Sequence, residues 1–181
     1  MVILDGKKTS LDIKNEIAEE VKSILNKGQR APHLAAVIVG NDGASLTYVG
    51  SKVKACERVG FDSTLIKLDE SISEDELLDK VNELNNDDKI DEYIVQLPLP
   101  KHIDSQKILL AVDPKKDVDG FHPTNFGRMA LNLPTFISAT PHGIMELLKR
   151  YNVSTEGKNT IVIGRSDIVG KPISILMGLK T

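Results

Sequence analysis

Amphipathic segments alternate with short apolar runs through the first part of the chain, and this alternation restricts the fold more than any other feature. Apolar residues recur every three to four positions in the amphipathic segments, whereas the short runs are rich in β-branched residues. The expected helices cover residues 10–28, 44–60, 73–85 and 103–112, and the expected strands cover residues 34–40, 63–68 and 91–97. This order favours the α/β class, with an open, mostly parallel sheet and helices on its faces.

The composition is that of a globular protein, and it excludes several classes of function. Of 181 residues, 40% are hydrophobic and 27% are charged, and the net charge of −3 offers no basic surface to nucleic acid or anionic lipid. The apolar runs are strand-sized and no secretory signal is visible at the amino terminus, so we expect no membrane partner. The single cysteine, Cys56, indicates a reducing compartment. We therefore expect a cytoplasmic protein in which Cys56 is a small core residue, although a nucleophile is conceivable.

Several residues are typical of helix ends. Ser10 and Gly28 are expected to begin and end the first helix. Ser73 and Glu76 have the spacing of a capping box. Thr140 is expected to cap the helix over residues 140–151, with a proline at its first position.

Tyr48 and Lys52 lie four residues apart in the helix over 44–60, so they share one face. Val49, Val53 and Cys56 form the neighbouring apolar stripe, which we expect to face the core. A lysine at this half-buried edge would lose hydration, which lowers its pKa, and the tyrosine ring offers a surface for a flat ligand. The alternative is a surface lysine and an interfacial tyrosine on an ordinary helix.

Gln96 is the polar residue at the carboxyl end of the third expected strand, just before Pro98-Leu99-Pro100. The two prolines end the strand and hold an extended backbone. Ligands of open parallel sheets bind beyond the carboxyl ends of the strands, and the helix with Lys52 also begins there. We therefore expect both elements to meet at one cleft. Alternatively, Gln96 only caps the loop backbone.

The turn-rich loop DPKKDVDGFHP, residues 113–123, holds Asp113, Asp117, Asp119 and His122. The spacing matches no calcium loop and no zinc signature, so we expect no metal. Asp113 and Asp117 are expected to cap turns. Asp119 is interpreted as a hydrogen-bond acceptor for the ring nitrogens of a ligand, with a turn cap as the alternative.

A strand–glycine turn–helix unit is expected near the carboxyl terminus. The strand would cover residues 160–163, the turn is Gly164-Arg165-Ser166, and the helix would open near Gly170. Such turns hold phosphates on backbone N–H groups, although the usual G-x-G-x-x-G spacing is absent. Arg165 suits an additional phosphate such as the 2′-phosphate of NADP. The alternative is a tight turn with a surface arginine.

Taken together, these stretches resemble the bifunctional methylenetetrahydrofolate dehydrogenase/methenyltetrahydrofolate cyclohydrolase family. The matching segments are YVGSKVKACERVG, YIVQLPLP, DPKKDVDGFHPTNFGRM, ATPHGIMELLKRY and VIGRSDIVGKPIS. The resemblance implies that residues 1–119 form a folate-binding catalytic domain. It also implies that residues 120–181 form a linker, a connecting helix and the start of a Rossmann-type NADP-binding domain.

The resemblance further implies the oxidation of 5,10-methylenetetrahydrofolate by NADP and hydrolysis of the methenyl product to 10-formyltetrahydrofolate, which serves purine biosynthesis. The implied catalytic residues are Lys52, Tyr48 and Gln96; the implied substrate-binding residues are Tyr48, Lys52, Gln96, Leu97 and Asp119; and the implied cofactor-binding residues are Gly164, Arg165 and Ser166. The implied partners are a folate substrate and, in a homodimer, a second subunit.

The chain departs from the family in its length, because only one strand of the expected nucleotide domain is present before Thr181. We expect either a fragment of a longer two-domain protein or a chain that pairs its open sheet edge with another chain, and in this chain we expect dehydrogenase activity to be essentially absent. Two other functions remain open: a non-catalytic folate-binding fragment, and an NADP oxidoreductase similar to shikimate dehydrogenase.

Overall fold

The computed structural model describes residues 3–179, and the chain divides into two compact units. The first, here called the sheet unit, comprises residues 12–117. The second, here called the helical unit, combines residues up to Leu11 with those from Val118 onward. The helix α1 (Gly6–Asn26) spans this division. No helix among residues 3–179 is long and apolar enough to cross a membrane.

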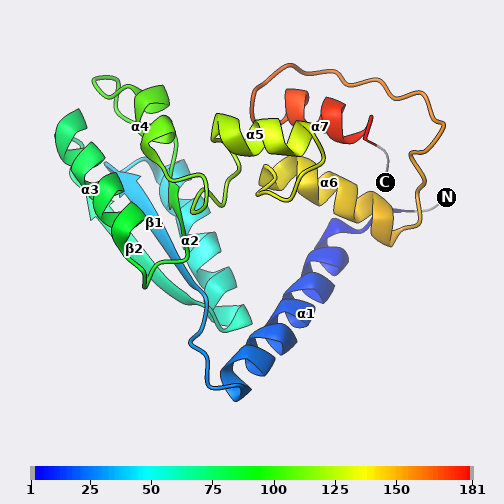
Figure 1. Ribbon diagram of the computed structural model, residues 1–181, viewed down its shortest axis with the longest axis horizontal. Helices are drawn as coiled ribbons and strands as arrows, with labels where there is room; N and C mark the ends of the chain where they lie inside the picture. Colours follow the sequence, from blue (N-terminus) through cyan, green and yellow to red (C-terminus); the bar gives the residue numbers. More distant parts are fainter. Residues whose placement is uncertain (1–2, 180–181) are drawn as a thin grey trace. The chain divides into compact units, whose positions relative to one another are not determined.

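Strands and helices alternate in the sheet unit, as the sequence predicts (Figure 1). After α1, the sheet unit contains β1 (His33–Val39), α2 (Gly43–Val59), β2 (Asp62–Leu68), α3 (Glu74–Asn86), β3 (Glu92–Val95) and α4 (Ser105–Ala111). The helical unit contains α5 (Pro123–Ala130), α6 (Ala139–Arg150) and α7 (Gly170–Leu176).

The three strands form one open sheet in the order β2-β1-β3, and both pairings are parallel. The central strand β1 places Val37 opposite Ile66 on one side and Val95 on the other. Beside β3, Asp117 forms an isolated parallel bridge with Tyr93. The predicted fold class, an open parallel sheet with flanking helices, is therefore confirmed.

Both faces of β1 are buried, as expected for a central parallel strand. The alternation of side chains sends Val37 to one face and Ile38 to the other, and each is at most 1% exposed. On the Val37 face, the core includes Leu77 and Val81 of α3. On the Ile38 face, the core includes Val49 of α2. The sheet is thus a central layer with helices packed on both sides.

The capping box of α3 is confirmed: the Glu76 amide donates to the Ser73 hydroxyl, and the Ser73 amide donates to the Glu76 carboxylate. The prediction that Ser10 begins the first helix was wrong, because α1 starts four residues earlier. The Asp5 carboxylate accepts a hydrogen bond from the Lys8 amide at 2.9 Å and so caps α1 before Ser10 is reached.

One further prediction, for the helical unit, was wrong. α6 begins at Ala139, so Thr140 is its second residue and not its cap; the residue before the helix is Ser138, whose hydroxyl donates to the Ile168 carbonyl instead of capping α6. The helix α5 was not predicted. It has two recognisable signals, a proline at the first helical position and His122 Nδ1, which accepts a hydrogen bond from the Thr124 amide.

The predicted strand over residues 160–163 is absent. Ile161 is 87% exposed and Ile163 is 99% exposed. A strand needs a neighbour to pair its backbone groups, and none of residues 3–179 pairs with this segment as a strand. The helix predicted to follow it is present as α7, which begins at Gly170.

Candidate functional site

The helix α2 carries Tyr48 and Lys52 one turn apart. Tyr48 is 67% exposed and Lys52 is half-buried, whereas the neighbouring Val49 is 1% exposed. The predicted apolar stripe is confirmed, since Val49 and Cys56 are buried and Val53 packs against the core on the Ile38 face of the sheet. A ligand that stacks on the Tyr48 ring would therefore find it accessible.

The helix α2 is capped at both ends. The Asp42 carboxylate accepts a hydrogen bond from the Ser45 amide at 2.7 Å, which lowers the Asp42 pKa. Gly60 adopts a φ of 85° and donates its amide to the Cys56 carbonyl at 3.0 Å. Burial raises the pKa of the Cys56 thiol. A buried protonated thiol is unreactive, as expected of a core cysteine.

Ser45 is a buried polar residue that was not predicted from the sequence; it is 5% exposed. It lies seven residues before Lys52, so the two share a helix face two turns apart. In the sequence, Ser45 is a polar residue on the same helix face as Tyr48 and Lys52. A serine in the first turn of a helix is common, so this position alone did not indicate a functional residue.

Gln96 follows β3 directly and continues its pairing with β1, since its amide donates to the Val37 carbonyl at 2.9 Å. Its side-chain Nε2 donates to the Leu97 carbonyl at 2.7 Å. This bond fixes the amide orientation and leaves Oε1 buried with no hydrogen-bond partner among the described residues. A buried, unpaired acceptor is costly, so this oxygen is well suited to receive a donor from a lysine or a ligand.

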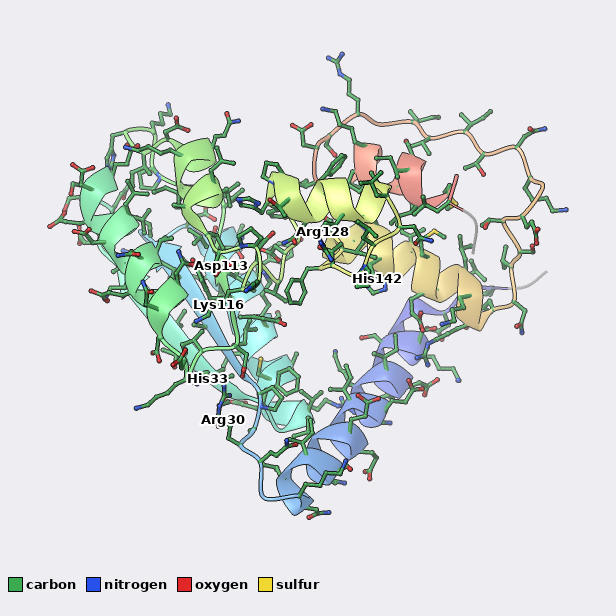
Figure 2. The ribbon with its side chains drawn as sticks, viewed as in Figure 1. Arg30, His33, Asp113, Lys116, Arg128 and His142 are labelled. Carbon is green, nitrogen blue, oxygen red and sulfur yellow. The ribbon has the colours of Figure 1, made fainter. Side chains whose placement is uncertain are left out.

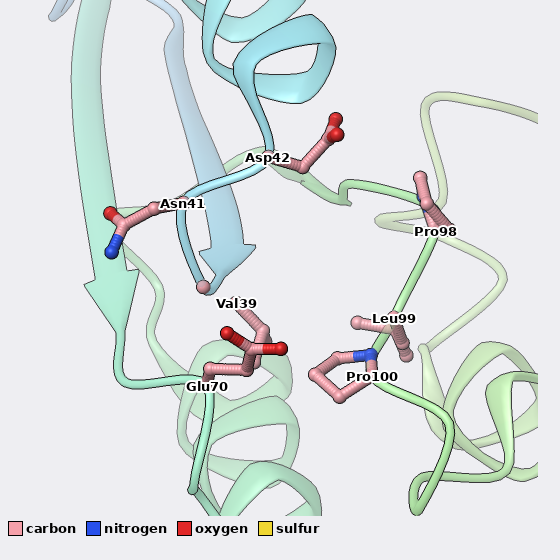
Figure 3. A pocket seen from close by; sticks show the side chains of 8 residues that line it. Val39, Asn41, Asp42, Glu70, Pro98, Leu99 and Pro100 are labelled. Carbon is pink, nitrogen blue, oxygen red and sulfur yellow. The ribbon is translucent and has the colours of Figure 1, made fainter.

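A pocket of about 380 Å³ opens beyond the carboxyl ends of all three strands (Figure 3). Each strand contributes its following loop to the lining, which consists of Val39, Gly40, Asn41, Asp42, Glu70, Pro98, Leu99 and Pro100. The position is the one expected for a ligand site in an open parallel sheet. Tyr48, Lys52 and Gln96 do not line this pocket. Two carboxylates in its lining make it a poor site for an anion.

The loop over residues 113–123 begins in the sheet unit and is fixed at its start. The Asp113 carboxylate accepts from the Lys115 amide at 2.8 Å, so the predicted turn cap is confirmed. Asp117 is 6% exposed, and Asp119 is half-buried. Among residues 3–179, no group of three or more His, Cys, Asp or Glu side chains could hold a metal ion.

Gly120, which follows Asp119, lies in the helical unit and cannot be replaced easily. Its φ is 67°, and an added Cβ would lie 2.8 Å from the Ser138 amide nitrogen. The backbone directly after Asp119 is therefore packed closely against the segment before α6. In this loop the sequence predicts the turn, but not the close approach that requires glycine.

The turn Gly164-Arg165-Ser166 lies before α7. Ser166 Oγ accepts from the amides of Val169 and Gly170 at 3.2 Å and 3.1 Å, so it caps the start of α7. A Cβ on Gly170 would lie 2.6 Å from the Arg165 amide nitrogen, so glycine lets the turn pack onto the helix. The Arg165 side chain is exposed. This turn therefore has the compact backbone and accessible cation that a phosphate group requires.

The fold and these sites define an α/β protein with a parallel-sheet unit and a glycine turn that fits a phosphate group. Residues 4–119 match the family model described as "Tetrahydrofolate dehydrogenase/cyclohydrolase, catalytic domain", and residues 138–181 match the model of its NAD(P)-binding domain. The chain belongs to the tetrahydrofolate dehydrogenase/cyclohydrolase family. This membership argues against an oxidoreductase similar to shikimate dehydrogenase.

Relatives and solved structures match nearly the whole chain. The chain is 73% identical over 180 residues to the bifunctional protein FolD of Flavobacterium johnsoniae, and 62% identical over 175 residues to that of Porphyromonas gingivalis. The matches cover 99% and 97% of the chain, and 61% and 59% of those relatives, so the chain spans about three fifths of their length.

Two solved structures are similar in fold. The FolD structure from Campylobacter jejuni superimposes with a TM-score of 0.95 at 46% identity, over 98% of this chain and 63% of that one. The FolD structure from Trypanosoma brucei, described as complexed with NADP cofactor and inhibitor, gives a TM-score of 0.92 at 33% identity, over 98% of this chain and 61% of that one.

Proposed function

We propose that this chain acts in one-carbon folate interconversion, by NADP-dependent oxidation of 5,10-methylenetetrahydrofolate and hydrolysis of the methenyl product to 10-formyltetrahydrofolate. Its family membership and its similarity to the Campylobacter jejuni FolD, a methylenetetrahydrofolate dehydrogenase/cyclohydrolase, support the proposal. The observation that carries it is the unpaired Oε1 of Gln96, buried at the carboxyl end of the parallel sheet. An oxygen in this position accepts a hydrogen bond from a catalytic ammonium group or from a bound pterin.

In the hydrolysis step, water attacks the methenyl carbon and one carbon–nitrogen bond of the five-membered ring breaks. Lys52 is the group that we propose takes a proton from the attacking water and returns one to the leaving nitrogen. Gln96 would hold the lysine, and Tyr48 would stack on the folate with its exposed ring. Asp119 and Leu97 would bind the pterin. These roles require positioned groups and a proton carrier, with no metal ion.

The residues proposed to hold NADP are Gly164, Arg165 and Ser166. The turn fits a phosphate, because its backbone is packed onto α7 through Gly170 and the Arg165 guanidinium is exposed next to it. When bound, NADP supplies the hydride acceptor for the oxidation step. Arg165 would grip the 2′-phosphate and so favour NADP over NAD.

The cellular setting is also a proposal. Residues 1–119 would bind folate, and residues 120–181 would form the linker and the start of the nucleotide domain. We propose a homodimer in the cytoplasm that supplies 10-formyltetrahydrofolate for purine biosynthesis. A single buried cysteine suits a reducing compartment. The oligomeric state can be measured by light scattering.

The proposal is tested by replacing Lys52 with methionine, which keeps an unbranched side chain and removes the proton carrier. We expect hydrolysis of 5,10-methenyltetrahydrofolate, followed by its absorbance, to fall at least ~100-fold while the melting temperature changes little. The matched control is Lys54→Met, because Lys54 is exposed on the same helix. Near-normal hydrolysis by Lys52→Met, or an equal loss in Lys54→Met, would refute the assignment of Lys52.

One observation favours a second candidate, a folate-binding chain without hydride transfer. The segment before the glycine turn is not a strand, and its isoleucines are exposed, so no sheet among residues 3–179 supports the turn that we propose to hold NADP. NADP reduction and methenyl hydrolysis should therefore be assayed separately. Hydrolysis or folate binding without NADP reduction would favour this candidate, whereas NADP reduction by the purified chain would exclude it.

A further inference from the structure

Asn85, near the end of α3, makes three hydrogen bonds with its side-chain amide. Its Nδ2 donates to the Ala111 carbonyl at 2.8 Å, where α4 ends. Its Oδ1 accepts from the Asp113 amide at 2.8 Å and from the Tyr93 hydroxyl at 2.7 Å. Two of the three bonds hold the backbone at the start of the loop over residues 113–123.

Lys116 holds the next part of the same loop (Figure 2). Its Nζ donates to the carbonyls of Leu84 and Asp87, each at 2.8 Å, at the carboxyl end of α3. A cation is favourable there, because the last carbonyls of a helix have no partner within it and carry partial negative charge. The Lys116 carbonyl in turn accepts from the Tyr93 amide at 3.0 Å, which attaches the loop to β3.

Asn85 and Lys116 are here called the loop clamp. Four of their five bonds end on backbone groups, those of Ala111 and Asp113 and those at the end of α3, and the fifth ends on the Tyr93 hydroxyl. The loop clamp therefore fixes the backbone conformation of residues 111–116. The segment that it fixes ends at Asp117, which is 6% exposed and bridges to Tyr93.

Asp119 comes two residues after Asp117 in the sequence. Two residues of extended chain span at most about 7 Å, so a fixed Asp117 restricts the positions that Asp119 can reach. A ligand that bonds to an already ordered side chain does not have to order it on binding, which strengthens the complex. The clamp is thus placed to act on affinity for a ligand of Asp119.

We propose that Asn85 and Lys116 are positioning residues that set the affinity for reduced folate by holding the segment before Asp119. This inference rests on the proposed function, in which Asp119 binds the pterin. It gives a role to Lys116 of the motif DPKKDVDG, a residue that has no role in the proposed reaction.

The test compares Asn85→Ala with Tyr93→Phe in this chain. Asn85→Ala removes all three bonds, whereas Tyr93→Phe removes the hydroxyl bond to Asn85 and a longer one to the Val81 carbonyl at 3.5 Å, and leaves Asn85 holding Ala111 and Asp113. The probe is 5-formyltetrahydrofolate, with its Kd measured by titration calorimetry, and Asp119→Ala is included as the reference for loss of the direct contact. Amide hydrogen exchange over residues 113–119 reports the order of the segment without ligand.

We expect Asn85→Ala to raise the Kd by ~10-fold and to speed amide exchange over residues 113–119, while Tyr93→Phe changes the Kd less than ~2-fold. Lys116→Met, which keeps the side-chain stem, should act in the same direction as Asn85→Ala. It also carries the test if Asn85→Ala fails to fold.

Three outcomes would overturn the inference. If Asn85→Ala and Lys116→Met bind like the parent chain while Asp119→Ala loses affinity, the clamp has no role and the proposed function stands. If Tyr93→Phe loses as much affinity as Asn85→Ala, the effect follows stability and not position. If the parent chain binds no 5-formyltetrahydrofolate, or Asp119→Ala binds it unchanged, the proposed pterin contact fails and the inference fails with it.

Discussion

Residues 37–40 and 161–164 carry almost the same sequence, VIVG and IVIG, but only residues 37–39 lie in a strand. Val37 and Ile38 of β1 are 0% and 1% exposed, whereas Ile161 and Ile163 are 87% and 99% exposed. Because the two sequences are almost the same, their local preference for an extended backbone is also almost the same. The difference lies in what surrounds each region.

The strand β1 has a parallel neighbour on each side, and helices cover both faces of its sheet. Pairing satisfies its backbone groups, and the helices take its side chains out of water. None of residues 3–179 provides a neighbouring strand to residues 160–163. β-branched residues thus favour a strand only where a sheet is available to receive them.

The largest expected effect tests this comparison with the same substitution in both regions. Ile38→Ala leaves a cavity between the sheet and α2 and should lower the free energy of unfolding of the sheet unit by about 2–5 kcal/mol. Ile163→Ala removes an exposed side chain and should change stability by no more than about 0.5 kcal/mol. Urea denaturation of both variants measures the difference. An equal loss would mean that residues 160–163 are packed in solution.

The sheet unit was predicted well because each of its signals is local or periodic. The buried inner face of α3, formed by Leu77, Val81 and Leu84, follows from helical spacing, and its capping box from Ser73 and Glu76. The start of α1 was misplaced because Asp5 and Ser10 are both good caps, and the sequence alone does not show which one is used.

For the residues proposed for the site, the sequence predicts the helix or strand that carries each one, but not their contacts. Helical spacing predicts that Tyr48 and Lys52 share a face, and the strand end predicts the position of Gln96. The unpaired Oε1 of Gln96 could not be predicted, because it depends on the bond from Nε2 to Leu97. The hydrogen bonds of Asn85 could not be predicted either, because they join α3 to segments outside it, at Tyr93, Ala111 and Asp113.

A smaller effect on the free energy of unfolding is expected at the starts of two helices, one in the sheet unit and one in the helical unit. These variants extend the comparison of the two regions. Ser73→Ala removes the capping box of α3 and should cost about 1 kcal/mol. Thr140→Ala, at an exposed position inside α6, should cost less than about 0.5 kcal/mol. Urea denaturation gives the magnitudes, and hydrogen exchange of α3 and α6 assigns them. A cost for Thr140→Ala equal to that for Ser73→Ala would restore Thr140 as a cap.

The smallest effect on stability is expected for the ion pair between Arg30 and Asp91, which lie just before β1 and β3. This pair is a further link between the two strands. Asp91 accepts two bonds from the Arg30 guanidinium, at 2.6 Å and 2.7 Å, and one from the His33 amide at 2.8 Å. Figure 2 labels Arg30 and His33. The bonds from Arg30, and then that from His33, hold the pKa of Asp91 below its ordinary value. Both side chains are about half exposed, so solvent screens the pair and limits its contribution to under about 1 kcal/mol.

The lowered pKa of Asp91 fixes the direction of the pH dependence. A carboxylate with a pKa lower in the folded state than in the unfolded state stabilises the fold above the unfolded pKa, near 4, and loses this contribution as the pH falls through the folded pKa. Asp91→Asn should therefore be less stable than the parent chain at pH 7, and the difference should shrink as the pH falls below about 4. Asp88→Asn is the matched control, because Arg30 contacts only the backbone carbonyl of Asp88. Urea denaturation at pH 7 and at a pH below about 4 provides the test. If the difference in stability between Asp91→Asn and the parent chain is the same at both pH values, the Arg30 pair does not stabilise the sheet through the carboxylate charge.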